Sequence, residues 1–153
     1  MELDLDSLLR MAAAVFCGGL IGLNRDIYGK PTGIRAHALV SLGAALLVVA
    51  VDHTYTGPTH PDAMSRVVQG VIAGIGFLGG GVILRGTTDM HVYHLVTAAT
   101  LWVTTGIGIL CGLGAWKLAF AATVVVLAVL MGGAYLDKWL YRKGGVRNDD
   151  REP

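Results

Sequence analysis

Five long apolar stretches, separated by short polar segments, dominate the hydrophobic pattern of this chain. They cover about residues 8 to 23, 36 to 51, 67 to 84, 95 to 113 and 118 to 136. A helix needs roughly 20 apolar residues to cross a bilayer, and polar flanks can lengthen the shorter stretches. The pattern predicts an all-α, polytopic membrane protein with five transmembrane helices. Four spans remain an alternative if the first stretch lies flat on the membrane.

The composition supports the same class. The chain has 153 residues, of which 54% are hydrophobic and 15% are charged, whereas an average soluble domain has about 25% charged residues. No segment combines basic and aromatic residues as nucleic-acid-binding segments do. We expect a single transmembrane domain over residues 1–143 and a disordered cytoplasmic tail over residues 144–153. The acidic N-terminus is unlike a cleavable signal peptide, so the first helix is expected to be retained.

The positive charges predict an orientation. If the N-terminus lies outside, the inside segments hold Arg25, Lys30, Arg35, Arg85, Lys138, Arg142, Lys143, Arg147 and Arg151. The outside segments then hold only Arg10, Arg66 and Lys117. Because short cytoplasmic loops carry an excess of Lys and Arg, this bias predicts the N-terminus out and the C-terminus in.

The chain lacks the residue patterns of an enzyme or of a dedicated metal site. It shows no nucleophile–base pair, phosphate-binding loop or paired catalytic carboxylates. Cys17 and Cys111 fall in apolar stretches and are expected to be small packing residues. The outer-side candidates match no established ligand spacing and are expected to be solvated: Asp52, His53, His60 and Asp62. No cofactor is expected, and a bound magnesium ion is left open.

The third stretch contains six of the 22 glycines of the chain: Gly70, Gly74, Gly76, Gly79, Gly80 and Gly81. Small residues four apart let helices cross closely, as for Gly70/Gly74, Gly76/Gly80, Gly18/Gly22 and Gly108/Gly112. The triplet at residues 79 to 81 has a second interpretation. It can mark an unwound turn whose backbone faces a cavity, as in transporters.

Ionisable residues gather in the two inner loops. The first loop supplies Arg25, Asp26, Arg35 and His37, and the second supplies Arg85, Asp89, His91 and His94. If the spans form a bundle, the two loops meet on one membrane face and form a candidate ion gate. The alternative is ordinary interfacial residues, with ion pairs worth about 0–1 kcal/mol each.

Polar residues inside apolar spans are costly and therefore informative. The candidates are Gln69, Ser41, Thr97, Thr100, Thr104 and Thr105. Thr97, Thr100 and Thr104 share one helix face, and with Gln69 they can line a polar path between the third and fourth helices. Alternatively, the hydroxyl groups bond carbonyls of their own helix.

Four blocks of sequence resemble the MgtC/SapB family of bacterial inner-membrane proteins. They are Gly19-Leu-Ile-Gly-Leu-Asn-Arg-Asp, Gly33-Ile-Arg-Ala-His-Ala-Leu-Val, Gly74-Ile-Gly-Phe-Leu-Gly-Gly-Gly-Val-Ile-Leu and Val96-Thr-Ala-Ala-Thr-Leu-Trp-Val-Thr. The resemblance covers about residues 10 to 135. It also marks Phe77 and Trp102 as family-motif aromatics. The chain looks like a short member, without the cytoplasmic C-terminal domain of better-known relatives.

The resemblance implies a five-span protein of the bacterial inner membrane that is associated with magnesium limitation. It also implies, for some members, survival inside host cells and direct contact with the ATP synthase. Our leading hypothesis is magnesium-linked cation handling through a polar site around the third and fourth helices. The alternative is a non-transporting regulator that binds partner helices of another membrane complex, such as the ATP synthase. A third hypothesis is a homo-oligomeric scaffold, and self-association in the lipid bilayer is expected under each.

Overall fold

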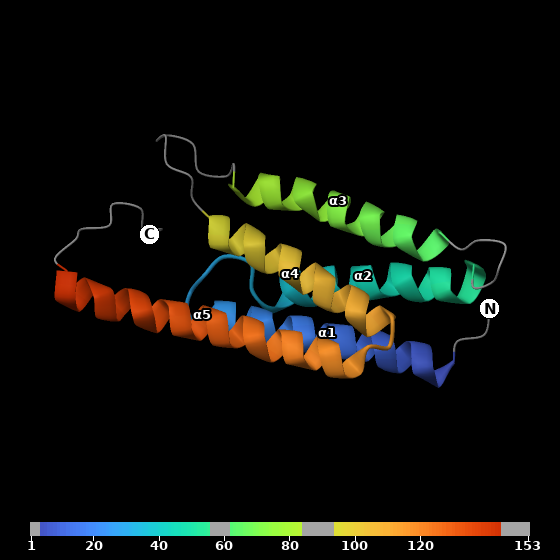
Figure 1. Ribbon diagram of the computed structural model, residues 1–153, viewed down its shortest axis with the longest axis horizontal. Coiled ribbons are helices and arrows are strands. Elements are labelled where there is room, and N and C mark those ends of the chain that lie inside the picture. Colours follow the sequence, from blue (N-terminus) through green and yellow to red (C-terminus); the bar gives the residue numbers. More distant parts are fainter. Residues whose placement is uncertain (1–3, 56–61, 84–93, 145–153) are drawn as a thin grey trace.

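The computed structural model describes residues 4–55, 62–83 and 94–144, and every regular element in these ranges is an α-helix. The helices are α1 (Leu5–Ile27), α2 (Ile34–Tyr55), α3 (Ala63–Ile83), α4 (Leu95–Gly112) and α5 (Trp116–Gly144). They lie roughly along the long axis of the molecule (Figure 1). All five are long and apolar enough to cross a membrane. The predicted all-α, five-helix fold is confirmed, and most of the helices continue into the polar flanks of their apolar stretches.

α2 is packed between α1 and α4, and glycines on both neighbours make this possible. A methyl group added at Gly18 of α1 would lie 2.6 Å from the His37 carbonyl oxygen. One added at Gly108 of α4 would collide with the Ser41 backbone. Small residues at such crossings let helix backbones approach closely. The predicted close crossings are confirmed for Gly18/Gly22 and Gly108/Gly112.

The apolar core lies where α1, α2, α4 and α5 meet. Its buried members are Ala14, Cys17, Ile21, Ala45, Ile107, Cys111 and Ala119. Cys17 and Cys111 are free thiols that are 5% and 0% exposed. Their expected role as small packing residues is confirmed, since both belong to this core.

α3 lies at the edge of the bundle and packs through one face only. Ile75 is its single buried residue. Partly buried side chains of α3 pack against α2 and α4, namely Met64, Val67, Val68, Val71 and Ile72. Because lipid tails are as apolar as these side chains, a membrane helix can leave the rest of its surface exposed to lipid.

The glycine triplet Gly79-Gly80-Gly81 lies inside α3, which continues to Ile83. The unwound turn that the sequence left open is therefore absent. None of the three glycines has a positive φ. Inside a bilayer, free backbone N–H and C=O groups find no water, so the helical conformation is favoured because it satisfies them internally.

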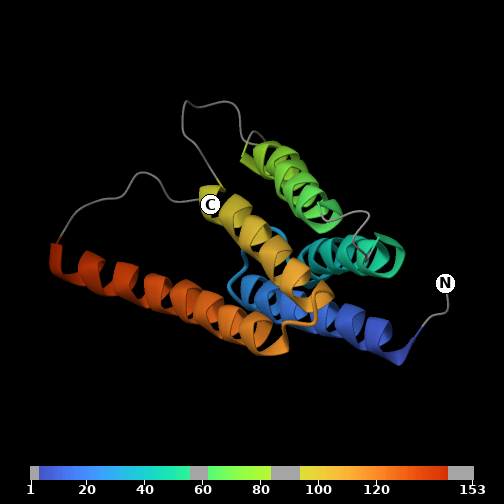
Figure 2. The ribbon, with the colours of Figure 1, turned by 45° about the vertical axis from the view of Figure 1, so that its right-hand side comes forward.

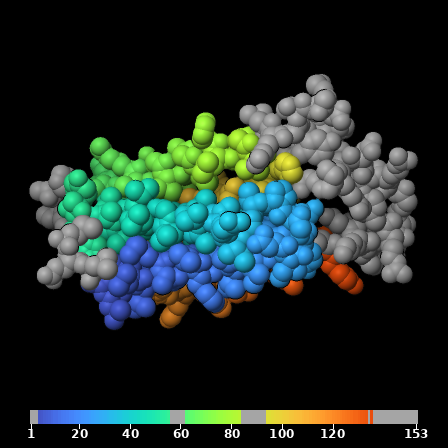
Figure 3. All heavy atoms as spheres, turned by 180° about the vertical axis from the view of Figure 1, so that it is seen from behind, coloured from blue at the N-terminus to red at the C-terminus, as the bar shows by residue number. Residues whose placement is uncertain are grey.

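α5 contacts the bundle along its first half and then diverges from α1 and α4 (Figure 2). Ala119 and Thr123 are the most buried of its described side chains, and Val126 and Leu130 are among those that pack on the core. On the opposite side of the molecule, α1, α2 and α3 form one continuous face (Figure 3). The helices α1, α2 and α4 are thus the packed centre, and α3 and α5 are peripheral.

Candidate functional site

A polar cluster forms where the end of α1 meets the starts of α2 and α4. Arg25, in the last turn of α1, is only 6% exposed. Its Nη2 donates a hydrogen bond of 2.7 Å to Oγ1 of Thr97 on α4, whose side chain is also buried. Removing a charge from water is costly, so such a group needs partners. The bond therefore ties α1 to α4. We call Arg25, Asp26, His37 and Thr97 the inner polar cluster.

Asp26 connects the end of α1 to the start of α2. Its Oδ2 accepts a hydrogen bond of 3.0 Å from the backbone N–H of Ile34, the first residue of α2. A carboxylate is favourable there because the helix N-terminus carries partial positive charge. A methyl group at Gly33 would collide with this carboxylate. Gly33 therefore leaves the space that Asp26 needs to cap α2.

His37 is completely buried one turn further along α2. Its Nδ1 is hydrogen-bonded to the Gly33 carbonyl oxygen at 3.2 Å. Its Nε2 and the Oγ of Ser41 have no hydrogen-bond partner among the described residues. The Arg25 guanidinium is close enough to act on His37 electrostatically. The Asp26 carboxylate acts on His37 with the opposite sign, so the two charges offset one another in part.

The threonines of α4 are buried, but their hydroxyl groups are mostly satisfied within the helix. Thr100 donates to the carbonyl of Thr97 at 2.8 Å, and Thr104 to that of Thr100 at 2.7 Å. Thr105 donates to the carbonyl of Leu101 at 2.9 Å. These are the intrahelical bonds that the sequence left open as an alternative. The hydroxyl protons of Thr100, Thr104 and Thr105 are therefore donated to carbonyls of their own helix.

The structure brings together only part of the predicted ion path. The inner polar cluster lies among α1, α2 and α4, rather than between α3 and α4. Gln69 is exposed on α3, and Arg35 is exposed near the start of α2. The predicted candidates Arg85 and Asp89 lie outside the described residues. The family-motif aromatics Phe77 and Trp102 are 85% and 50% exposed and point away from the core.

The glycines of α3 make almost no packing contact with the described residues. A methyl group added at Gly70, Gly74, Gly76, Gly80 or Gly81 would meet no atom within 4 Å. Gly79 differs only slightly, because its methyl group would be 3.7 Å from the Ala98 Cβ. The α3 glycines therefore leave an open surface, in contrast to those of α1 and α4.

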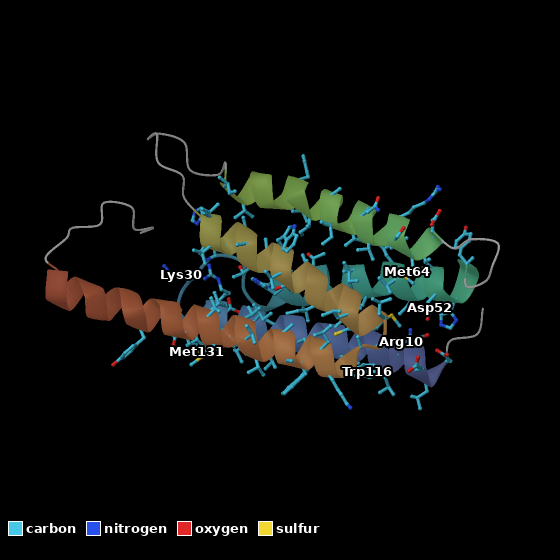
Figure 4. The ribbon with its side chains drawn as sticks, viewed as in Figure 1. Arg10, Lys30, Asp52, Met64, Trp116 and Met131 are labelled. Carbon is cyan, nitrogen blue, oxygen red and sulfur yellow. The ribbon has the colours of Figure 1, made fainter. Side chains whose placement is uncertain are left out.

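At the opposite end of the bundle, Arg10 joins three helices, a role that we did not predict. Its Nε lies 2.7 Å from Asp6 and its Nη1 2.9 Å from Asp52 of α2. Nη1 also donates to the carbonyl of Gly112 at the end of α4, at 3.0 Å. Figure 4 shows Arg10 and Asp52 at this end of the molecule. The sequence feature that could have indicated this contact is an arginine inside one apolar stretch together with an aspartate at the end of another.

Beside Arg10, Asp4 caps α1. The Ser7 side chain and the Ser7 backbone N–H, which lies 2.9 Å from the Asp4 carboxylate, hold the pKa of Asp4 below its usual value. The carboxylate is favourable there because a helix N-terminus carries partial positive charge. Oγ of Ser7 is also hydrogen-bonded to Nε2 of His53 at 2.6 Å. These contacts fasten the start of α1 to the end of α2.

The described ranges hold no group of three or more His, Cys, Asp and Glu side chains that could bind a metal ion. Magnesium is bound through oxygen ligands, commonly one or two carboxylates with several waters. In the inner polar cluster the only carboxylate, Asp26, already caps α2. The described residues thus do not fit a resident magnesium ion, and no step through one follows from them.

An open apolar groove of about 670 Å³ runs between α2 and α3. Its walls include Leu39, Gly43 and Leu47 of α2 and Gly70, Gly74 and Leu78 of α3. Among the described residues, Arg66 of α3 is the one charged residue that lines it. We call it the α2–α3 groove.

These features agree with the comparison of the whole sequence with protein families. The model of the MgtC family matches residues 11–139. The chain belongs to the MgtC family. It is accordingly a multi-pass membrane protein of a bacterial family. No solved structure shows a significant match to the chain.

Individual relatives cover the same region. Protein MgtC of Salmonella typhimurium is 44% identical over 120 residues, which are 78% of this chain and 49% of the relative. Protein MgtC of Brucella abortus is 40% identical over 119 residues, 78% of this chain and 48% of the relative. Protein SrpB of Synechococcus elongatus is 38% identical over 141 residues, 86% of this chain and 78% of the relative. The chain therefore spans about half the length of the MgtC proteins that it matches.

Proposed function

We propose that this MgtC-family protein is a non-transporting regulator of the bacterial inner membrane that binds a transmembrane helix of another membrane complex. The binding surface is the outward face of α3, formed by Gln69, Ala73, Gly76 and Gly80. These residues are spaced four, three and four apart and so share one helix face. All four are exposed or half-buried.

Gln69 is the observation that carries this proposal. Its carboxamide is exposed on a membrane helix and forms no hydrogen bond with any described residue. Lipid tails offer no hydrogen-bond partner, whereas a neighbouring helix does. Gly76 and Gly80 beside it have no atom near their would-be methyl groups, which permits close approach of a second backbone.

Arg66 favours a different protein over a second copy of this chain. It precedes Gln69 by three residues and lines the α2–α3 groove, so it lies at the margin between that groove and the outward face of α3. Two copies related by a twofold axis normal to the membrane would bring two Arg66 side chains together. Juxtaposed like charges oppose association. The sequence predicted a homo-oligomer. The tests must therefore distinguish a homo-oligomer from a complex with a different protein.

The magnesium-linked role that the family implies would then be exerted through the partner complex. A cation path through this chain has less support, because Gln69 is exposed on α3 while the α4 threonines are buried, and the described residues hold no group of three or more His, Cys, Asp and Glu side chains. The ATP synthase is the first complex to test, because the family resemblance implies contact with it.

The test is recovery of the complex after gentle solubilisation of bacterial membranes. We expect the wild-type chain to co-migrate with a larger membrane complex. The variants Gln69→Leu and Gly76→Leu should no longer co-migrate with this complex. Gly132→Leu on α5 is the matched control, because Gly132 is also exposed with open space around it. Recovery only as a monomer or a homo-oligomer contradicts the proposal.

A further inference from the structure

We propose that the α2–α3 groove binds one acyl chain of an anionic phospholipid, whose phosphate is held by Arg66. This site is separate from the outward face of α3. It concerns the side of α3 that faces α2, where Gly70, Gly74 and Leu78 form the wall.

The length of the groove matches one leaflet of a membrane. Along α3 it extends from Arg66 to Leu78. Twelve residues at about 1.5 Å each give about 18 Å. One leaflet of a hydrocarbon core of about 30 Å measures about 15 Å. The groove thus begins near the headgroup level, where α3 begins, and ends near the middle of the bilayer.

The walls of the groove are apolar and uncrowded. Methyl groups added at Gly43, Gly70 or Gly74 would meet no atom within 4 Å. Glycines on both walls therefore leave a slot that the described side chains do not fill. At the end away from Arg66, the lining residues Leu39 and Leu78 are apolar. One charged end and one apolar end suit a lipid with an anionic headgroup.

Arg66 has no described partner that explains its position. Its guanidinium forms no ion pair with any described residue, including Asp62, which lies four residues earlier. Arg66 is the fourth residue of α3. A cation in the first turn of a helix is unfavourable because the helix N-terminus is itself positive. A phosphate would compensate this charge through a bidentate, charge-assisted hydrogen bond.

A transmembrane helix fits the groove less well than a lipid does. Such a helix crosses the whole hydrocarbon core of about 30 Å, whereas the groove follows α3 for about 18 Å. A lipid of one leaflet needs only the shorter distance. The observations therefore favour a lipid, and a bound helix becomes an outcome of the test.

The test is native mass spectrometry of the full chain released from detergent micelles with equal amounts of phosphatidylglycerol and phosphatidylethanolamine. We expect the wild-type chain to retain one phosphatidylglycerol after other lipids are stripped. Arg66→Gln should lower this retention about tenfold, equivalent to about 1.4 kcal/mol, and remove the preference over phosphatidylethanolamine. Gly74→Leu should fill the groove and abolish retention of both lipids.

Two controls carry matched changes outside the groove. Arg35→Gln removes an exposed arginine near the start of α2, and Gly132→Leu adds the same side chain on α5. Both should retain phosphatidylglycerol like the wild type. Undiminished retention by Arg66→Gln or Gly74→Leu overturns the proposal. Equal retention of the two lipids by the wild type also overturns it. A photoreactive residue at Gly74 that cross-links to a peptide helix in the groove would overturn it as well.

Discussion

Arg25 and Thr97 lie 72 positions apart in the sequence and are joined by a buried hydrogen bond of 2.7 Å. The bond connects the last turn of α1 to the first turn of α4. With Asp26 capping α2, it brings three helices together at one end of the bundle. The inner polar cluster is thus a structural junction, and its charge is committed to helix positioning.

Replacing Thr97 by valine should destabilise the bundle. The change keeps the shape of the side chain but leaves the Arg25 Nη2 without this buried acceptor. We expect a loss of about 1–3 kcal/mol in the free energy of unfolding. The measurement is unfolding by denaturing detergent in mixed micelles, followed by circular dichroism.

Thr105→Val is the control, because the Thr105 hydroxyl bonds only the Leu101 carbonyl of its own helix. Its loss should stay below about 1 kcal/mol. Equal losses for Thr97→Val and Thr105→Val would show that the hydrogen bond to Arg25 contributes nothing specific.

Gly108→Ala should be more harmful than Gly106→Ala, although the two sites are two residues apart on α4. A methyl group at Gly108 collides with the Ser41 backbone, whereas one at Gly106 meets no atom within 4 Å. Overpacking costs about 1–3 kcal/mol, while alanine in an open helix position gains up to about 1 kcal/mol over glycine. The measurement is the midpoint temperature of thermal unfolding in detergent for the two variants. Similar midpoint temperatures would contradict this packing.

The sequence predicted the number of helices and the close crossings at Gly18 and Gly108 because length, hydropathy and small-residue spacing are local signals. It did not predict which helices form the centre. In a bilayer, side chains facing lipid and side chains facing protein are equally apolar, so hydrophobic periodicity does not distinguish them. The glycines of α3 therefore resembled the packing glycines of α4, although the structure leaves them open.

The candidate site was predicted only in part, and the reason for the incomplete prediction is similar. Arg25, Asp26, His37 and Thr97 were named from the sequence, and the structure assembles them. The expected path of Thr97 with Gln69 stays a prediction: Thr97 is bonded to Arg25 and Gln69 is exposed, and nothing in the sequence shows which neighbour the buried face of α4 contacts. The contacts of Arg10 were missed because a polar residue near the end of a span looks like an interfacial anchor.

Arg10 and Asp52 should be energetically coupled. The Arg10 side chain is 20% exposed, and it also bonds the Gly112 carbonyl. A double-mutant cycle with Arg10→Gln and Asp52→Asn should therefore give a coupling energy of about 1 kcal/mol, the upper part of the range for surface pairs. Additive effects of the two changes would mean that the pair does not fasten α1 to α2.

Proteoliposomes that contain only this protein should not conduct magnesium ions. The reason is that the polar path expected between α3 and α4 is not assembled, since Gln69 is exposed on α3 while Thr100 and Thr104 are buried and donate to carbonyls of α4. Uptake of magnesium, read by an enclosed fluorescent indicator, should equal that of empty vesicles. Uptake that is above this background and is lost in Thr100→Val would support a cation path instead.

The central claim, that the outward face of α3 binds a helix of another protein, is tested most directly by photo-cross-linking in native bacterial membranes. A photoreactive residue at Gly76 should cross-link to a transmembrane segment of a different protein, identified by mass spectrometry, and Gln69→Leu should remove this product at equal expression. The same photoreactive residue at Gly132 of α5 should not give it. Cross-links at Gly76 only to lipid or to a second copy of this chain would contradict the account.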